Sequence, residues 1–197
     1  MERKRKIIVA LTGASGSVYA RLLCARLAVA QGVGEIALIA TDNGLRVAAF
    51  EDDVRWMSDP RFTRYDNGDL FSAPASGSAS FDAMAVVPCS MGTAGRIASG
   101  VSSDLVGRAA DVMLKERRRL VVVPREAPLH AIHLRNLAAL AECGAVICPA
   151  SPSFYSKPDG VEALCGTIVE RVVALLGIDA PHYEWGSEPR GAGDFRK

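Results

Sequence analysis

Two opposite charges directly follow the most apolar segment of the chain. Residues 121–123 are all valine, Pro124 follows them, and Arg125 and Glu126 come next. Because proline fixes φ and lacks an N–H, this pair would lie on stiff backbone where a buried strand ends. An arginine there suits a phosphate or a ligand carbonyl, and a neighbouring carboxylate suits proton transfer. A local ion pair that only closes the strand is the competing interpretation.

A glycine-rich turn, TGASGS at residues 12–17, follows an earlier apolar segment and opens a helical pattern. Free N–H groups and the helix dipole at such a turn attract a phosphate, and Ser15 would add a hydroxyl. A tight strand-to-helix connection would need the same glycines. Thr41 comes after the next apolar segment, where it would cap a helix or contact the same ligand. Capping is the simpler interpretation.

A third turn, PCSMGT at residues 88–93, offers small residues and hydroxyls at another helix start. Cys89 is a possible nucleophile, but no histidine is near it in sequence, so we expect a packed thiol. Further along, Arg108, Asp111 and Lys115 are spaced for one helical face. For Arg108 and Lys115, the sequence does not decide between a functional role and a place on a solvated, salt-bridged helix face. Residues 117–119 are expected to be solvated.

Two segments near the C-terminus also carry side chains that could bind a ligand. Tyr155 lies on a proline-flanked loop, and Arg171 falls on the apolar stripe of the helix that follows. A buried arginine needs a partner, so an anion shared with Tyr155 is expected to pair with it. His130 and His133 are three residues apart, but no acidic or cysteine partner is near them, and a metal site is therefore not predicted.

The elements that would position these residues alternate between short apolar and longer amphipathic segments. Strands are expected at 7–11, 36–40, 83–87, 120–123 and 145–148, and helices at 17–31, 43–50, 104–117, 132–143 and 161–176. Continuous apolar strands are typical of parallel sheets covered on both faces. We predict a three-layer, doubly wound α/β fold with a mostly parallel, Rossmann-like or flavodoxin-like sheet. Ligands bind beyond the carboxyl ends of such strands, where the residues above cluster.

Length and composition favour one domain, residues 1–178, with a tail at 179–197 that docks on a neighbouring subunit. The segment 52–80 is rich in turn formers and is expected to be irregular, as a lid or an interface. The 23 basic and 22 acidic residues give a net charge of +1, which indicates neither nucleic-acid nor membrane binding. Five scattered cysteines indicate reduced thiols, and we expect a cytoplasmic protein.

Taken together, these motifs resemble the flavin prenyltransferase family, the UbiX-like proteins formerly described as aromatic acid decarboxylases. The resemblance rests on TGASGS, Glu51, PASGSAS, DAMAVVPCSMGT, PASPSFY and VERVVALLGI, and above all on GRAADVMLKERRRLVVVPREAPLHAIHL. These segments occur in order across residues 7–178. The resemblance implies a metal-independent enzyme that attaches a dimethylallyl group from dimethylallyl monophosphate to N5 and C6 of reduced FMN. The product, prenylated FMN, would serve a UbiD-type decarboxylase.

The resemblance also implies a role for each matching residue. FMN would be bound by Gly13, Ala14, Ser15, Thr41, Ser90, Met91, Gly92, Thr93 and Arg125. The prenyl phosphate would be bound by Tyr155, Arg171, Lys115 and Arg108, with Trp185 near the prenyl group. Glu51 and Glu126 would be the acid/base carboxylates, and Ser15 and Lys115 would assist catalysis.

The family forms large homo-oligomers, commonly dodecamers, in which Tyr155, Arg171 or Trp185 would reach a neighbouring subunit's site. Asp104, Arg135 and Gly166 depart from the family pattern, and Arg135 and Gly166 bear on subunit contacts. Two alternatives stay open: an FMN-dependent cysteine decarboxylase, and a non-catalytic subunit that binds and delivers FMN. The second is disfavoured because binding FMN alone would not require Glu126, Lys115 and Arg171 together.

Overall fold

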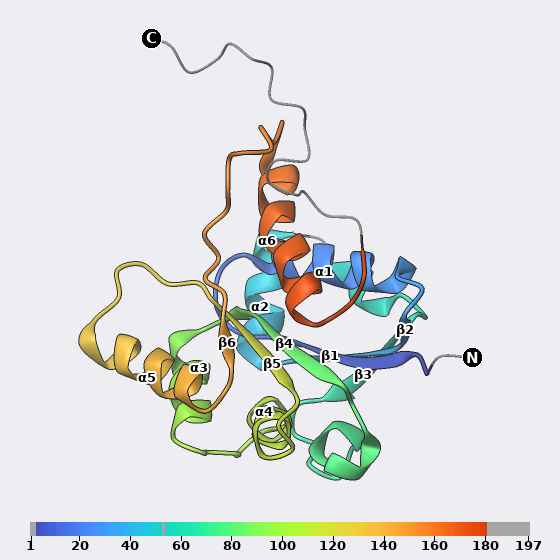
Figure 1. Ribbon diagram of the computed structural model, residues 1–197, viewed down its shortest axis with the longest axis vertical. Helices are drawn as coiled ribbons and strands as arrows, with labels where there is room; N and C mark the ends of the chain where they lie inside the picture. Colours follow the sequence, from blue (N-terminus) through green and yellow to red (C-terminus); the bar gives the residue numbers. More distant parts are fainter. Residues whose placement is uncertain (1–2, 53, 181–197) are drawn as a thin grey trace.

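A single parallel sheet organises the chain. The computed structural model describes residues 3–52 and 54–180. Six strands pair in the order β3-β2-β1-β4-β5-β6, and every pairing is parallel (Figure 1). The strands are β1 (Arg5–Leu11), β2 (Val33–Ala40), β3 (Phe62–Asp66), β4 (Ala83–Cys89), β5 (Arg119–Pro124) and β6 (Val146–Ile147). The order reverses between β1 and β4, and this reversal creates the crevice in which doubly wound sheets bind ligands.

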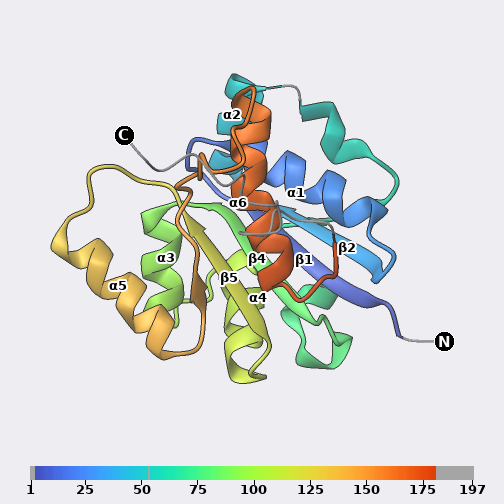
Figure 2. The same ribbon diagram turned by 45° about the horizontal axis from the view of Figure 1, so that its top comes forward.

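Helices cover both faces of the sheet and make three layers. They are α1 (Ser17–Val29), α2 (Asp42–Glu51), α3 (Met91–Ala98), α4 (Leu105–Lys115), α5 (Ala131–Glu142) and α6 (Val161–Leu175). One core cluster joins the sheet to α1, α2 and α6, and a second joins the opposite face to α3, α4 and α5. Figure 2 shows α6 and α1 on one side of the strands and α4 on the other. The predicted three-layer, doubly wound α/β fold is confirmed.

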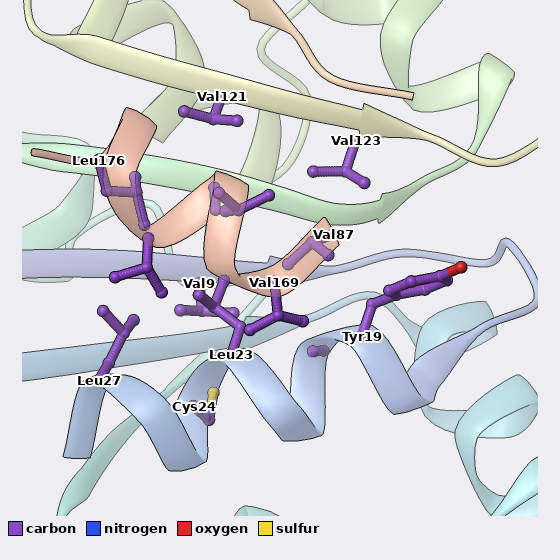
Figure 3. Packing of buried hydrophobic residues seen from close by; sticks show 14 of the residues in the cluster. Val9, Tyr19, Leu23, Cys24, Leu27, Val87, Val121, Val123, Val169 and Leu176 are labelled. Atoms are coloured by element: carbon purple, nitrogen blue, oxygen red, sulfur yellow. The ribbon is translucent and has the colours of Figure 1, made fainter. Parts of the chain in front are cut away.

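The strands hold together through buried aliphatic side chains on both faces. Val9, Val121 and Val123 are at most 1% exposed, and Leu23 of α1 and Val169 of α6 pack over them (Figure 3). Fully burying one such side chain stabilises the fold by roughly 1.5–3 kcal/mol. This packing fixes α1 and α6 against the sheet, so the loops at the carboxyl ends of the strands emerge from a rigid base.

The segment 52–80 is more ordered than its composition predicted. It contains β3, which pairs with β2 along residues 62–66, and three short 3-10 helices: η1 (Val54–Ser58), η2 (Ala73–Ala75) and η3 (Gly77–Ala79). β3 was missed because it is an edge strand whose Phe62 and Tyr65 are only half-buried, so it lacks a continuous apolar run. The prediction of an irregular segment was therefore wrong for β3.

The arginine run after α4 is not uniformly solvated, contrary to the sequence interpretation. Arg118 is half-buried and donates hydrogen bonds to the carbonyl oxygens of Phe81 (3.1 Å) and Gly77 (2.8 Å). Arg119 donates to the carbonyl of Leu176 at 3.3 Å. Arg118 and Arg119 therefore bind backbone carbonyls of a short helix, a loop and the end of α6.

Within the described residues, no helix combines the length and the apolar character that crossing a membrane requires.

Candidate functional site

The loops that follow β1 and β4 are joined by one buried hydroxyl. Thr12 is fully buried, and its Oγ1 donates to the Pro88 carbonyl at 2.8 Å while accepting from the Ser90 N–H at 2.8 Å. The Arg125 N–H, after β5, donates to the Cys89 carbonyl at 3.2 Å. Three predicted ligand-binding segments therefore meet at the carboxyl edge of the sheet. The sequence interpretation did not single out Thr12, although its place before the glycines was a usable signal.

A carboxylate from another element occupies the N-terminus of α1. Glu51, the last residue of α2, accepts hydrogen bonds from the Gly16 N–H at 2.9 Å, the Ser17 N–H at 2.9 Å and the Ser17 hydroxyl at 3.0 Å. The Ser15 side chain also hydrogen-bonds to it. Gly16 has φ of 102°, a left-handed conformation that glycine adopts without strain.

This arrangement keeps Glu51 ionised. Partial burial raises the pKa of the Glu51 carboxyl, but the hydrogen bonds from Ser15, Ser17 and Gly16 together lower that pKa below its usual value. The N–H groups of Gly16 and Ser17 are consequently taken by an internal anion. The expectation that free N–H groups at this helix start bind a phosphate is therefore wrong for these two residues, and only the loop before them remains available.

The start of α2 lies close against the first loop. Thr41 caps α2 by accepting from the Gly44 N–H at 3.0 Å, which confirms the capping interpretation, and its own N–H donates to the Leu11 carbonyl at 3.0 Å. A Cβ at Gly13 would lie 2.8 Å from the Asn43 Cβ. The first loop thus needs glycine at position 13 to pass this helix, and Thr41 borders the same edge.

The start of α3 presents hydroxyls and backbone donors beside the first loop. Ser90 caps α3 by accepting from the Thr93 N–H at 3.3 Å, and its hydroxyl lies 3.1 Å from the Thr93 hydroxyl. The first N–H groups of a helix have no intrahelical partner, so those of Met91 and Gly92 are suited to a ligand. Cys89 is fully buried, and this burial raises its pKa to about 12, in agreement with a packed thiol.

Arg125 and Glu126 are both exposed at the end of β5. In the part of the chain that the structure describes, they form no ion pair with each other, so the interpretation of a local strand-closing pair is wrong. Tyr19 of α1 faces the same edge (Figure 3). Burial and a hydrogen bond with Cys165 raise the pKa of Tyr19 to about 12, and the nearby charge of Arg125 opposes that rise.

Arg171 is exposed and borders a cavity, rather than being buried in the apolar stripe of α6 as expected. The cavity has a volume of about 280 Å³ and is lined by Ser151, Ser153, Ser156, Thr167, Ile168, Glu170, Arg171 and Ala174. The Ala150 N–H donates to the Pro124 carbonyl at 3.1 Å, so this serine-rich loop starts beside Arg125. The sequence interpretation noted the aromatic residues of the loop and overlooked its serines.

The predicted phosphate-binding residues do not all gather in one chain. Tyr155 belongs to the same loop and is 69% exposed, but it does not line the cavity. Lys115 ends α4 and pairs with Glu116 at 2.6 Å, four residues before β5 begins. It therefore lies at the amino edge of the sheet, separated from Arg125 by the length of β5, roughly 20 Å.

Arg108 also has local partners. Its Nε donates to the Ala75 carbonyl at 3.0 Å, and its Nη1 pairs with Asp111 at 2.8 Å. A cationic cradle of Arg108, Lys115 and Arg171 within one chain is therefore not observed. Asp104 caps α4 by accepting from the Gly107 N–H at 2.8 Å, which gives this departure from the family pattern a local role. Trp185 lies outside the described residues.

His130 and His133 have a structural role in the isolated chain. His130 caps α5 and accepts from the His133 N–H at 3.4 Å, and the two rings stack with centroids 3.4 Å apart. Across residues 3–52 and 54–180, no group of three or more histidine, cysteine or acidic side chains is arranged to hold a metal ion.

The carboxyl edge fits a flat, phosphorylated ligand such as FMN. Gly13 and Gly92 are exposed, and a Cβ at Gly92 would meet only the Arg96 Nη1 at 3.9 Å, so backbone there is open to close approach. Hydroxyls of Thr41 and Ser90 and the exposed guanidinium of Arg125 add polar partners for a phosphate and for ring carbonyls.

Comparison with known proteins covers nearly the whole chain. Residues 1–177 match the family model described as Flavoprotein. A flavin prenyltransferase UbiX of Methanocaldococcus jannaschii is 43% identical over 185 residues, which cover 92% of this chain and 99% of that protein. A dodecameric FMN-dependent UbiX-like decarboxylase from Escherichia coli O157:H7 is 37% identical, with a TM-score of 0.87 and coverage of 91% and 98%. AnUbiX (PadA1), solved with FMN and dimethylallyl pyrophosphate, is 39% identical, with a TM-score of 0.82 and coverage of 93% and 100%.

Proposed function

The chain belongs to the Flavoprotein family and, within it, to the UbiX flavin prenyltransferases, and from this premise we propose how its residues act. It transfers a dimethylallyl group from dimethylallyl monophosphate to reduced FMN and releases prenylated FMN. The observation that carries the proposal is that Arg125 and the serine-rich loop that lines the cavity beside Arg171 start from the same strand end. Arg125 follows β5, and the Arg171 cavity begins at the loop that hydrogen-bonds to the same strand.

FMN would be held at the carboxyl edge of β1, β2, β4 and β5. Gly13, Ala14 and Ser15 would approach it from the first loop, Thr41 from the second, and Arg125 from the end of β5. The start of α3 would contribute Ser90, Met91, Gly92 and Thr93. The bound, reduced flavin supplies the nucleophilic N5 and C6 atoms. The Thr12 hydrogen bonds support this assignment because they fix the loop after β1 against the loop after β4.

The prenyl phosphate would occupy the cavity beside Arg171. Its leaving phosphate gains negative charge as the carbon–oxygen bond breaks, and a preorganised guanidinium with serine hydroxyls stabilises that charge. Tyr155, on the same loop, would shelter the positive charge on the allyl group with its ring face. Arg171 holds and orients the phosphate, and Tyr155 excludes water from the allyl carbon.

The two carboxylates would have different tasks. Glu126 is exposed beside Arg125, and among the described residues its carboxylate accepts only from the Ala127 N–H, at 3.1 Å. It is free to exchange a proton with the flavin during alkylation. Glu51, held ionised by its hydrogen bonds, orients the Ser15 hydroxyl toward the crevice instead of donating a proton.

Lys115 and Arg108 would act on a neighbouring subunit's cavity. Their position on α4, away from the Arg171 cavity of their own chain, supports this arrangement, and the UbiX-like relative described above is a dodecamer. We propose the same assembly here. The tail at 179–197, with Trp185, would dock on a neighbour, and the product would pass to a UbiD-type decarboxylase. A cytoplasmic location stays a prediction.

The decisive assay is anaerobic incubation with reduced FMN and dimethylallyl monophosphate, followed by mass spectrometry of the extracted flavin. Gain of one five-carbon unit is expected. An unchanged flavin despite tight FMN binding would instead support a delivery subunit. Oxidative decarboxylation of a peptide with a C-terminal cysteine, without flavin prenylation, would support the cysteine decarboxylase. The cysteine decarboxylase would need a peptide site, whereas the cavity beside Arg171 has a volume of only about 280 Å³ and half of its lining residues carry hydroxyls.

Subunit mixing tests the assignment of Lys115. The variants Lys115→Ala and Arg171→Ala should each lose most of their prenyl transfer while still binding FMN. When the two inactive variants are dissociated and reassembled together, some interfaces combine an intact Lys115 with an intact Arg171, and part of the activity should return. Mixtures that stay inactive, although mixed oligomers form, would contradict a contribution across subunits.

A further inference from the structure

The cavity beside Arg171 contains a negative charge as well as a positive one. Glu170 precedes Arg171 on α6 and lines the same cavity as the three serines and Thr167. Glu170 also lines a second hollow of about 570 Å³ between α1 and α6. Glu170 therefore forms part of the wall between the two spaces.

An ion pair holds this carboxylate in place. The Arg26 Nη2 of α1 lies 3.2 Å from the Glu170 Oε1, and the Glu170 side chain is 25% exposed. Arg26 lines the hollow between α1 and α6 and is absent from the lining of the cavity beside Arg171. The cation thus approaches Glu170 from outside the cavity, and the cavity keeps one guanidinium and one carboxylate in its own lining.

Resting on the proposed function, we propose that Glu170 is a specificity-determining residue that makes this cavity select a prenyl monophosphate over a prenyl diphosphate. A diphosphate brings at least one more negative charge into the cavity than a monophosphate does. The guanidinium and the hydroxyls attract either ester, whereas the carboxylate repels the more highly charged one more strongly. Selectivity is a difference between two binding free energies, and a repulsive group in the site is one way to create it.

A second ion pair between the same helices provides a matched control. Arg21 of α1 pairs with Glu162 of α6, and Glu162 lines the hollow but not the cavity beside Arg171. The variants Glu170→Gln and Glu162→Gln both remove one negative charge and one α1–α6 ion pair. They differ in whether the lost carboxylate faces the proposed phosphate site.

The experiment measures binding of inorganic phosphate and pyrophosphate by calorimetry, together with kcat/KM for dimethylallyl monophosphate and diphosphate. In Glu170→Gln, preference should shift toward pyrophosphate and the diphosphate ester by about five- to tenfold, the effect of one unit charge at a partly solvated site. Glu162→Gln should keep the wild-type preference. Arg26→Gln should shift it in the opposite direction because it removes the positive charge of Arg26 that partly neutralises Glu170.

The outcomes separate this inference from the proposed function. An unchanged preference in Glu170→Gln, or equal shifts in both glutamine variants, would overturn the role of Glu170. If the wild-type protein prenylates FMN with neither ester, the proposed function fails. The anion titrations would then still support or refute Glu170 as the source of selectivity in the cavity.

Discussion

The Glu51 carboxylate at the start of α1 provides a direct test of how the crevice is built. The variant Glu51→Gln keeps the shape of the side chain and one acceptor oxygen but removes the charge. The wild-type carboxylate accepts from two N–H groups and two hydroxyls at a helix N-terminus. We expect this substitution to lower the free energy of unfolding at neutral pH.

The magnitude follows from known effects at helix ends. Loss of an N-cap interaction costs about 0.5–2 kcal/mol, and a negative charge near a helix N-terminus contributes about 0.3–1 kcal/mol. Because glutamine retains one acceptor, we expect a loss of about 1–2 kcal/mol. For a chain of this size that loss lowers the melting temperature by about 2–8 °C.

The effect should depend on pH in a defined direction. The pKa of Glu51 is lower in the folded protein than in the unfolded chain, so its stabilisation is complete above the unfolded value, about 4.3. It is lost as pH falls through the folded value. The difference between wild type and variant should therefore be constant from pH 6 to 8 and should shrink in acid below about pH 4.

Thermal unfolding at fixed protein concentration measures this difference, because oligomer stability depends on concentration. Glu142→Gln is the control: Glu142 ends α5 and is exposed, and its side chain makes no hydrogen bond or ion pair with the described residues. Equal melting temperatures for wild type and Glu51→Gln at pH 7 would refute the proposed capping. A difference that persists unchanged into acid would refute the assigned ionisation.

Two further predictions concern Cys89 and Thr12, which lie at the carboxyl edge of the sheet. Iodoacetamide should label the native protein at Cys143, which is exposed, and should leave Cys89 unmodified because burial raises the pKa of the Cys89 thiol to about 12. Mass spectrometry of the intact protein and of its peptides measures the labelling. Labelling of Cys89 at neutral pH would contradict its burial. Thr12→Val keeps the side-chain shape but leaves the Pro88 carbonyl and the Ser90 N–H without their partner, so it should cost about 1–3 kcal/mol and weaken FMN binding in fluorescence titrations. Unchanged FMN affinity in this variant would show that the Thr12 bridge does not position the loops.

The fold was predictable because the central strands are continuous apolar segments separated by amphipathic helices. β1, β4 and β5 are buried on both faces, so their composition alone distinguishes them from helices. The edges of the sheet were less accessible to prediction. Three of the five β3 residues are exposed, and β6 spans only Val146–Ile147 of the predicted strand 145–148 because it has a single neighbouring strand.

The candidate site was predictable up to the strand ends and no further. Parallel strands place their carboxyl ends at one edge, so Gly13, Thr41, Ser90 and Arg125 were expected to lie together. The partner of each side chain depends on tertiary contacts. Nothing in the TGASGS turn indicates that Glu51, 35 residues after Gly16, fills the N-terminus of its helix. Composition likewise could not show that Arg171 faces a cavity rather than the core.

The position of Lys115 follows from the topology rather than from local sequence. In a parallel sheet, a connecting helix runs back against the strands, so its last turn lies at the edge where the next strand begins. Lys115 occupies the last turn of α4, and Arg125 lies after the opposite end of β5. A substitution within the chain cannot bring such a lysine to its own crevice without changing the fold. If Lys115 acts on the prenyl phosphate, the reaction therefore requires a neighbouring subunit. Dilution that dissociates the oligomer should then abolish prenyl transfer before it abolishes FMN binding, and retention of full activity in isolated monomers would exclude Lys115 from the site.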